Sequence, residues 1–169
     1  MKTSTDKIKE LREKSGGASV MACRNALIQS EDDINKALEI LKQQNLVIVE
    51  KKKGRTTSQG LVEAYVHAGG RIGAMIELNC ESDFVARTDE FKQLAHNIAM
   101  QVAAMPPLCI ALDNMPKDSE LSPQEACLLA QPFIKDLART IQDIINDTIA
   151  KVGENITIGR YSRFELGQE

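Results

Sequence analysis

The chain has 169 residues, of which 43% are hydrophobic and 27% charged, and its formal net charge is −3. This composition is typical of a folded globular protein and excludes disordered and fibrous chains. The sequence contains no apolar run of about 18 residues, as a membrane-spanning helix requires, and residues 1–6 lack the apolar stretch of a secretion signal. We therefore expect a cytoplasmic protein that does not cross a membrane.

Charge divides the chain into two parts. Residues 1–55 hold 12 basic and 8 acidic side chains, whereas residues 56–169 hold 9 basic and 16 acidic ones. The change falls in a polar, glycine-bearing stretch without apolar periodicity, which is typical of a linker. The sequence thus predicts an N-terminal module over residues 1–50, a basic linker over 51–60 and a second domain over 61–169.

The first part contains three short helical patterns. The first follows cap candidates at Thr3 to Thr5 and stops at Ser15, Gly16 and Gly17, and the second begins near Ser19. The third begins in the acidic run 30–33, which suits a helix N-terminus, and its apolar residues recur at helical spacing. These patterns predict a small three-helix module.

The second part begins with a predicted β-hairpin. Residues 61–67 and 71–79 flank a turn at Ala68 to Gly70, and the second run alternates between apolar and other residues. A helix capped near Thr88 follows and ends before Pro106, and residues 108–112 read as a short extended segment.

The remaining elements complete an α+β pattern. Apolar residues from Phe133 to Ile149 predict one long helix that ends at Val152 and Gly153, and residues 156–164 predict a last strand. We expect that strand to join the hairpin. The predicted fold is therefore a two-layer core, in which a three-stranded antiparallel sheet has its helices on one face.

The sequence offers little for catalysis. It has two histidines and four scattered cysteines, with no Cys-x-x-Cys pair and no hydrolase, phosphate-loop or dinucleotide motif. We therefore expect no enzyme, no cofactor, no metal site and no disulfide framework. His96 reads as a structural residue on a helix, whereas His67 at the hairpin tip is either a surface contact or merely solvated. A small hydrolase using Asp83 and His67 is a distant alternative, because no nucleophile or metal set accompanies them.

Residues 51–55, the basic run, form a compact positive patch of the kind that contacts phosphates. The net acidic chain and its few aromatic residues instead favour a solvated linker without direct nucleic-acid binding. An RNA- or ribosome-associated protein using the basic run remains the second candidate function.

The most unusual local feature is the segment 79–87, where Phe84 and Val85 stand beside acidic residues in a predicted loop. Both side chains could fold back onto the sheet as anchors. Alternatively, the segment could protrude as a wedge, because an exposed Phe gains about 1.5–3 kcal/mol on entering a partner's pocket.

Several ordered motifs resemble the elongation factor Ts family. They cover nearly the whole chain and include the sequence Ser82-Asp83-Phe84-Val85; the matching segments are 9–16, 21–27, 65–73, 77–87, 131–135, 149–156 and 163–167. The resemblance implies a guanine-nucleotide exchange factor that binds elongation factor Tu in its GDP form and promotes GDP release.

The resemblance also implies roles for particular residues. Phe84 would be the wedge that disturbs the magnesium site of Tu, with Asp83 as its polar partner and Ser82 and Val85 in the same element. The N-terminal module would be similar to a ubiquitin-associated domain. Further contacts with Tu are implied for Val20, Met21, Arg24, His67, Val152 and Gly153. Only one copy of the core β/α unit is present, so a homodimer is an expected arrangement.

Overall fold

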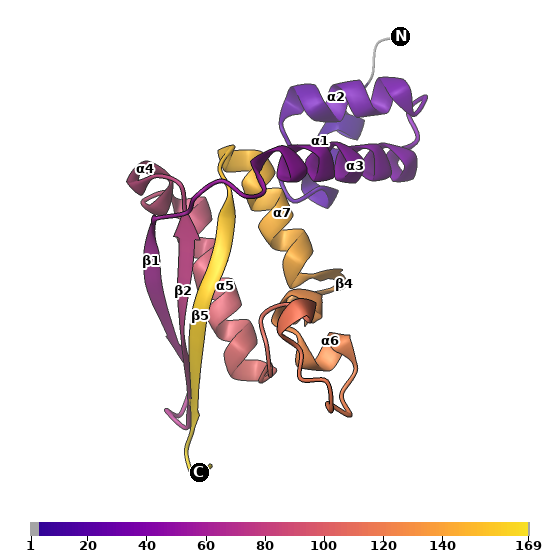
Figure 1. The fold of residues 1–169 in the computed structure, drawn as a ribbon. Helices are drawn as coiled ribbons and strands as arrows, with labels where there is room; N and C mark the ends of the chain where they lie inside the picture. Colours follow the sequence, from indigo (N-terminus) through magenta and orange to yellow (C-terminus); the bar gives the residue numbers. More distant parts are fainter. Residues whose placement is uncertain (1–3, 169) are drawn as a thin grey trace. The chain divides into compact units, whose positions relative to one another are not determined.

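The computed structural model describes residues 4–168 and divides the chain into two compact units, Met1–Lys53 and Gly54–Glu169. Figure 1 shows helices alone in the first unit and a sheet with helices in the second. In the part of the chain that the structure describes, no helix is both long and apolar enough to cross a membrane.

The first unit consists of three helices, as the sequence predicts: α1 (Thr5–Lys14), α2 (Val20–Gln29) and α3 (Ile34–Lys52). Side chains of Ser4, Ser19 and Asp33 accept hydrogen bonds from the first-turn amides of the three helices. Thr3, also a cap candidate, lies outside the described residues. The helices enclose a small apolar core of Leu11, Cys23, Ala26, Leu27, Ala37 and Leu41.

The connection between the units is shorter than the predicted linker. Helix α3 continues to Lys52 and strand β1 begins at Gln59, so both ends of the segment 51–60 belong to regular elements. Apolar residues 46–49 continue the helical pattern of α3, which explains the later end of this helix. The likeness of the first unit to a ubiquitin-associated domain stays a prediction.

The second unit contains the predicted three-stranded antiparallel sheet, with the order β1-β2-β5. Strands β1 (Gln59–Val66) and β2 (Ile72–Cys80) form the hairpin, and β5 (Ile156–Glu165) pairs with the other edge of β2. Strand β2 is therefore central, as Figure 1 shows. Its two ends define the two ends of the sheet.

Helix α5 (Asp89–Ala104) covers one face of this sheet and is capped by the Thr88 hydroxyl, as predicted. Its buried stripe includes Phe91 and Ile98, both fully buried, and lies against Ile76 and Leu78 of β2. Polar groups at the edge of this contact are paired: His96 Nδ1 lies 3.0 Å from Glu63 Oε1, and the Tyr161 hydroxyl donates to the Pro107 carbonyl at 2.7 Å. His96 thus has the structural role that its sequence context indicates.

The prediction of one long helix from Phe133 onward is wrong. Here the chain forms a one-turn helix α6 (Pro123–Ala126), a small sheet of β3 (Pro132–Phe133) and β4 (Asp136–Thr140), and only then helix α7 (Ile141–Val152). Two 3-10 turns, Leu112–Asn114 and Leu128–Ala130, lie in the same region. Helix α7 packs against α5 through its isoleucine stripe.

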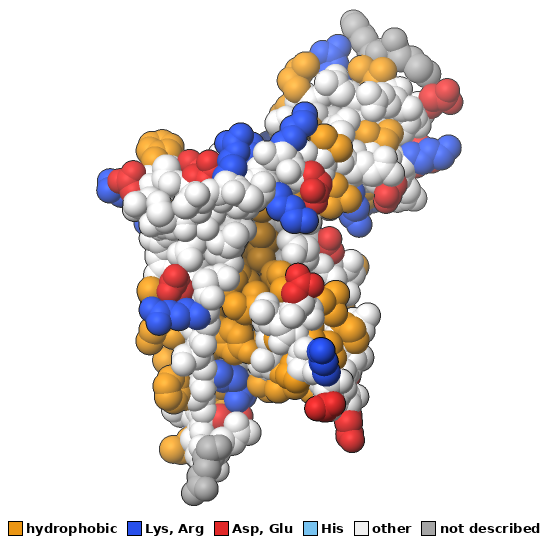
Figure 2. Space-filling view, in the orientation of Figure 1, with side chains coloured by type: hydrophobic (Ala, Val, Ile, Leu, Met, Phe, Trp, Pro, Cys, Tyr) orange, Lys and Arg blue, Asp and Glu red, His pale blue; other side chains and the backbone are white. Residues whose placement is uncertain are grey.

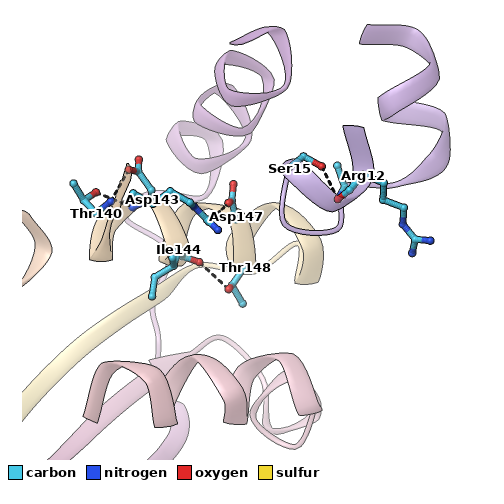
Figure 3. A network of polar contacts seen from close by, with 9 residues as sticks. Arg12, Ser15, Thr140, Asp143, Ile144, Asp147 and Thr148 are labelled. Carbon is cyan, nitrogen blue, oxygen red and sulfur yellow. Dashed lines mark hydrogen bonds and ion pairs between the residues drawn. The ribbon is translucent and has the colours of Figure 1, made fainter. Parts of the chain in front are cut away.

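A local capping contact and the exposure of Leu137 explain why the long helix is interrupted. The Thr140 hydroxyl accepts from the Asp143 amide while the Asp143 carboxylate accepts from the Thr140 amide, a capping box that begins a helix at Ile141. Figure 3 shows this pair. It also shows two hydroxyls that donate to backbone carbonyls: Thr148 to Ile144 within α7 and, in the first unit, Ser15 to Arg12. Leu137, counted in the predicted stripe, is 74% exposed on β4.

A buried amide pair holds the small sheet in place. Gln101 and Gln131 are fully buried, and Gln101 Nε2 donates to Gln131 Oε1 at 3.1 Å and to the Pro132 carbonyl at 3.2 Å. Gln101 Oε1 accepts from the Ile134 amide at 3.0 Å. These bonds satisfy backbone groups that a continuous helix would have paired locally, so a contact distant in sequence fixes the irregular chain path.

The structure also brings together two cysteines that the sequence leaves far apart. Cys109 and Cys127 form an isolated parallel β-bridge, and their buried thiols are hydrogen-bonded with sulfurs 2.9 Å apart. Burial and the neighbouring Cys127 raise the pKa of Cys109 to about 11. Cys109 is therefore protonated at neutral pH, and the contact between the two cysteines helps to close the segment between α5 and β3.

We predict that Gln101→Met destabilises the protein by about 2–4 kcal/mol, because the Ile134 amide and the Gln131 side chain would lose buried partners. Gln93→Met on the exposed face of α5 is the matched control and should change the free energy of unfolding by less than about 0.5 kcal/mol. Urea unfolding of the three proteins measures both values. Equal stability of the two variants would contradict the role of the amide pair.

Candidate functional site

The segment predicted as a loop after β2 contains a single helical turn, α4 (Asp83–Ala86). Ser82 caps it, because its hydroxyl accepts from the Val85 amide at 3.3 Å and its carbonyl accepts from the Ala86 amide at 3.3 Å. Cys80 at the end of β2 donates its thiol to the same carbonyl at 3.1 Å. The chain therefore passes directly from the central strand into a defined turn, which we call the α4 turn (residues 82–87).

The α4 turn divides its two apolar side chains between the interior and the solvent. Val85 is 5% exposed and packs into the core, whereas Phe84 is 77% exposed. The anchor interpretation of the sequence is thus right for Val85, and the protruding interpretation is right for Phe84. Figure 2 shows hydrophobic surface with acidic and basic side chains beside it at the end of the second unit that carries α4 in Figure 1.

An exposed ion pair lies beside Phe84. Arg87 Nη2 is 2.6 Å from Asp83 Oδ2, and the two side chains are 78% and 62% exposed. Ion pairs in such a solvated position contribute little to stability. Either partner can therefore pair with another protein at little cost.

A second turn lies beside the α4 turn. Antiparallel pairing places Ile156 of β5 opposite Cys80, so the residues before β5 lie next to the residues after β2. The Glu154 carboxylate accepts from the Ser82 amide at 3.0 Å and from the Ser82 hydroxyl at 2.6 Å. In return, the Glu81 carboxylate accepts from the Asn155 amide at 2.7 Å.

Val152 and Gly153, here called the corner, lie just before this second turn. Gly153 is the C-terminal cap of α7 with φ +75°, a left-handed conformation that glycine adopts without strain, and its amide donates to the Ile149 carbonyl at 2.8 Å. Both residues are half-buried. The structure thus brings the corner to the end of the sheet that carries Ser82, Asp83, Phe84 and Val85.

His67 lies at the opposite end of the sheet. It is exposed at the hairpin turn between β1 and β2, where its Nδ1 lies 3.0 Å from the Tyr65 hydroxyl. Nine residues of β2 separate this turn from the α4 turn, a span of roughly 30 Å. Asp83 and His67 therefore cannot act on one substrate atom, and the hydrolase alternative is wrong.

Val20, Met21 and Arg24 belong to the first unit. They occupy the first turns of α2, where Val20 is 51% and Met21 58% exposed and Arg24 is also exposed. The same helix buries Cys23, Ala26 and Leu27. The predicted contact residues are thus on the outer face of α2.

The site offers hydrogen bonding and an apolar contact but no metal cluster. Among residues 4–168, no three or more His, Cys, Asp or Glu side chains are grouped to hold a metal ion.

The basic run is divided between the two units. Lys53 pairs with Glu50 in the first unit and Arg55 pairs with Glu81 in the second, each at 3.5 Å.

The sequence reasoning missed Glu81 and Glu154. The predicted pairing of the last strand with the hairpin contains the relevant signal, because it places residues just before 156 beside those just after 80. No motif spacing indicates the bonds themselves. They depend on the register of two strands distant in sequence.

We predict different effects of the two neighbouring substitutions in α4. Phe84→Ala should change the free energy of unfolding by less than about 0.5 kcal/mol, because the side chain is largely in water. Val85→Ala should destabilise by about 1–2 kcal/mol, because it removes buried methyl groups. Thermal unfolding distinguishes the two. A loss for Phe84→Ala as large as that for Val85→Ala would mean that Phe84 is a core anchor.

Comparison with known proteins identifies the family. The family model described as elongation factor TS matches residues 3–122. Elongation factor Ts of Thermotoga neapolitana is 44% identical over 197 aligned positions that cover 100% of both chains. The elongation factors Ts of Moorella thermoacetica (43% identical; 95% of this chain, 94% of the relative) and Carboxydothermus hydrogenoformans (44% identical; 95% and 88%) are similar along nearly their full lengths.

The first of these alignments has more positions than the 169 residues of this chain, so it includes positions that this chain lacks. The match to the family model covers the first unit from residue 3 and the second unit as far as residue 122, which includes the complete α4 turn. The chain belongs to the elongation factor Ts family and is a factor of translation elongation in protein biosynthesis.

Proposed function

We propose that this protein is a guanine-nucleotide exchange factor, which binds elongation factor Tu in its GDP form in the cytoplasm and promotes GDP release so that GTP can bind. The observation that carries the proposal is Phe84, which is 77% exposed on a turn whose neighbouring Val85 is 5% exposed. A large apolar side chain is thus held out from a fixed support. Membership of the family, whose typical role is nucleotide exchange, gives this arrangement its partner.

Phe84 has the physical properties that a wedge requires. Transfer of a Phe side chain from water into an apolar pocket is favourable by about 1.5–3 kcal/mol. The ring moves about only two side-chain torsions, so little conformational freedom is lost on binding. Insertion into the GTPase near its magnesium site would use this energy to separate groups that hold the ion and the phosphates.

Asp83 and Arg87 supply polar contacts at the base of the wedge. Their ion pair is exposed, so Asp83 can move to donors or a cation of the partner without a large penalty. Ser82 and Val85 hold the turn from the inside. Val152 and Gly153 lie at the same end of the sheet, and the outer face of α2, with Val20, Met21 and Arg24, provides a further contact with Tu.

Exchange of this kind needs no covalent catalyst. If binding of this protein weakens GDP binding to Tu by some factor, GDP weakens binding of this protein by the same factor. A thousandfold effect corresponds to about 4 kcal/mol, which the burial of one Phe and the loss of magnesium contacts can provide together. The protein therefore acts on a GTPase without being an enzyme itself.

We predict that Phe84→Ala lowers the second-order rate constant for accelerated GDP release from Tu by roughly 10- to 100-fold, the equivalent of the lost apolar contact. The measurement uses Tu loaded with fluorescent GDP, excess unlabelled GDP and increasing amounts of this protein. Leu137→Ala, another exposed apolar residue at 74% exposure, is the control and should release GDP like wild type. Unchanged release with Phe84→Ala would exclude the wedge.

We also expect a homodimer that forms through the open face of the sheet. This face lies opposite α5 and carries exposed apolar side chains on all three strands: Val62, Val66, Met75 and Phe164. Three of them, Val66, Met75 and Phe164, border a groove of about 580 Å³. Contiguous apolar surface of this kind is typical of protein contacts, and a two-fold axis lets two copies cover the same surface on each other.

We predict that Met75→Glu shifts the protein toward monomer, because the change places a charge in the centre of the apolar face. Sedimentation equilibrium of wild type, Met75→Glu and the control Leu137→Glu measures this shift, and the control should remain dimeric. A wild-type protein that is monomeric up to high concentration would contradict the dimer without affecting the role of Phe84.

A further inference from the structure

Two turns at one end of the sheet are joined by hydrogen bonds to two carboxylates. Glu154, which precedes β5, accepts two hydrogen bonds from Ser82 in the α4 turn, and Glu81, which precedes the α4 turn, accepts one from the Asn155 amide. Asn155 is 8% exposed, and its side chain donates to the Arg55 carbonyl at 2.9 Å. Each turn is thus tied to the other through one carboxylate.

Ser82 is the point at which these bonds converge. Its amide and hydroxyl donate to Glu154, its hydroxyl also accepts from the Val85 amide, and its carbonyl accepts from the Cys80 thiol. Every polar group of Ser82 therefore has a partner. Hydrogen bonds to an ionised carboxylate are among the strongest in proteins, so Glu154 provides the firmest of these contacts.

The α4 turn cannot hold its own conformation. Helix α4 itself has four residues, and the backbone bonds from the Ala86 amide to the Ser82 carbonyl and from the Arg87 amide to the Phe84 carbonyl are both 3.3 Å long. Helices of one turn are unstable in water without tertiary contacts. The Asp83–Arg87 pair is exposed and adds little. The amide and hydroxyl of Thr88 donate to the Val85 carbonyl at 3.0 and 2.8 Å and hold the end of the turn. The start of the turn, which presents Phe84, depends on the buried Val85 and on the bonds at Ser82.

We propose that Glu154 is a positioning residue for nucleotide exchange: by holding the amide and hydroxyl of Ser82, it fixes the α4 turn in the conformation that presents Phe84 to the GTPase. This inference rests on the proposed exchange function. The reciprocal bond from Asn155 to Glu81 joins the segment that follows Val152 and Gly153 to the same turn. Phe84 and the corner thus form one preorganised contact surface.

Preorganisation of this kind lowers the apparent dissociation constant of the complex. A turn that is fixed before contact avoids an ordering cost when the complex forms. When only a fraction of the free protein is competent, the apparent dissociation constant rises in inverse proportion to that fraction. Loss of Glu154 should therefore raise the concentration needed for half-maximal GDP release and leave the maximal release rate nearly unchanged.

The decisive variant is Glu154→Gln, which keeps the size of the side chain and removes its charge. We expect the half-maximal concentration to rise by roughly tenfold, the lower range for losing bonds to a charged group. The matched control is Glu125→Gln, because Glu125 also accepts from the amide and hydroxyl of a serine, Ser122, at 3.0 and 2.7 Å, but within the capping box of α6. This control should bind and release as wild type does.

A double-mutant cycle separates positioning from general structural damage. In the Phe84→Ala background, Glu154→Gln should cause no further loss of exchange, because the residue acts through Phe84. Amide hydrogen exchange provides a readout without Tu: residues 82–87 should exchange faster in Glu154→Gln than in wild type and Glu125→Gln. Glu154→Asp, which keeps the charge but shortens the reach, should also raise the half-maximal concentration and serves if Glu154→Gln does not fold.

The inference would be overturned if both Glu154 variants accelerated GDP release as wild type does. It would also be overturned if Glu154→Gln reduced GDP release as much in the Phe84→Ala background as in wild type. Failure of wild-type protein to accelerate GDP release at all would instead refute the proposed exchange function. In that case, amide hydrogen exchange still tests whether Glu154 fixes the α4 turn. Unchanged amide hydrogen exchange rates of residues 82–87 in the variants would refute this structural role as well.

Discussion

The second unit depends on the burial of one apolar face of α5 against one face of a three-stranded sheet. Phe91 and Ile98 of the helix and Ile76 and Leu78 of β2 are almost completely removed from water, which is the dominant favourable term in folding. Because β2 is central, this contact also fixes where its two ends lie. The α4 turn and the hairpin turn are therefore positioned at opposite ends by the same packing.

Most regular elements follow from local sequence. The caps Ser19, Asp33 and Thr88 begin helices where the patterns predict them, and alternation identifies the strands of the main sheet. The prediction failed where distant contacts outweigh periodicity. The apolar stripe from Phe133 to Ile149 is interrupted by a small sheet that buried Gln101 holds through the Pro132 carbonyl and the Ile134 amide. Such amide contacts leave no periodic signal.

The sequence singles out the residues of the candidate site but not the contacts that support them. Phe84 and Asp83 are unusual in sequence, and the structure shows one exposed beside the other on a defined turn. Glu154 contacts Ser82 across 72 positions of the chain, so only the pairing of β2 with β5 brings them together. Asp83 and His67 lie at opposite ends of β2 because of the same topology. Their residue types alone make both of them candidates for catalysis, and only the fold shows that they are far apart.

We propose that an exposed Phe on a fixed turn couples this protein to the nucleotide bound by its partner. Coupling is reciprocal, so the most direct measurement is the affinity of this protein for elongation factor Tu with and without saturating GDP, for wild type and Phe84→Ala. We expect GDP to weaken wild-type binding strongly and Phe84→Ala to bind with nearly the same affinity in both conditions. Wild-type affinity that is independent of GDP would contradict this coupling.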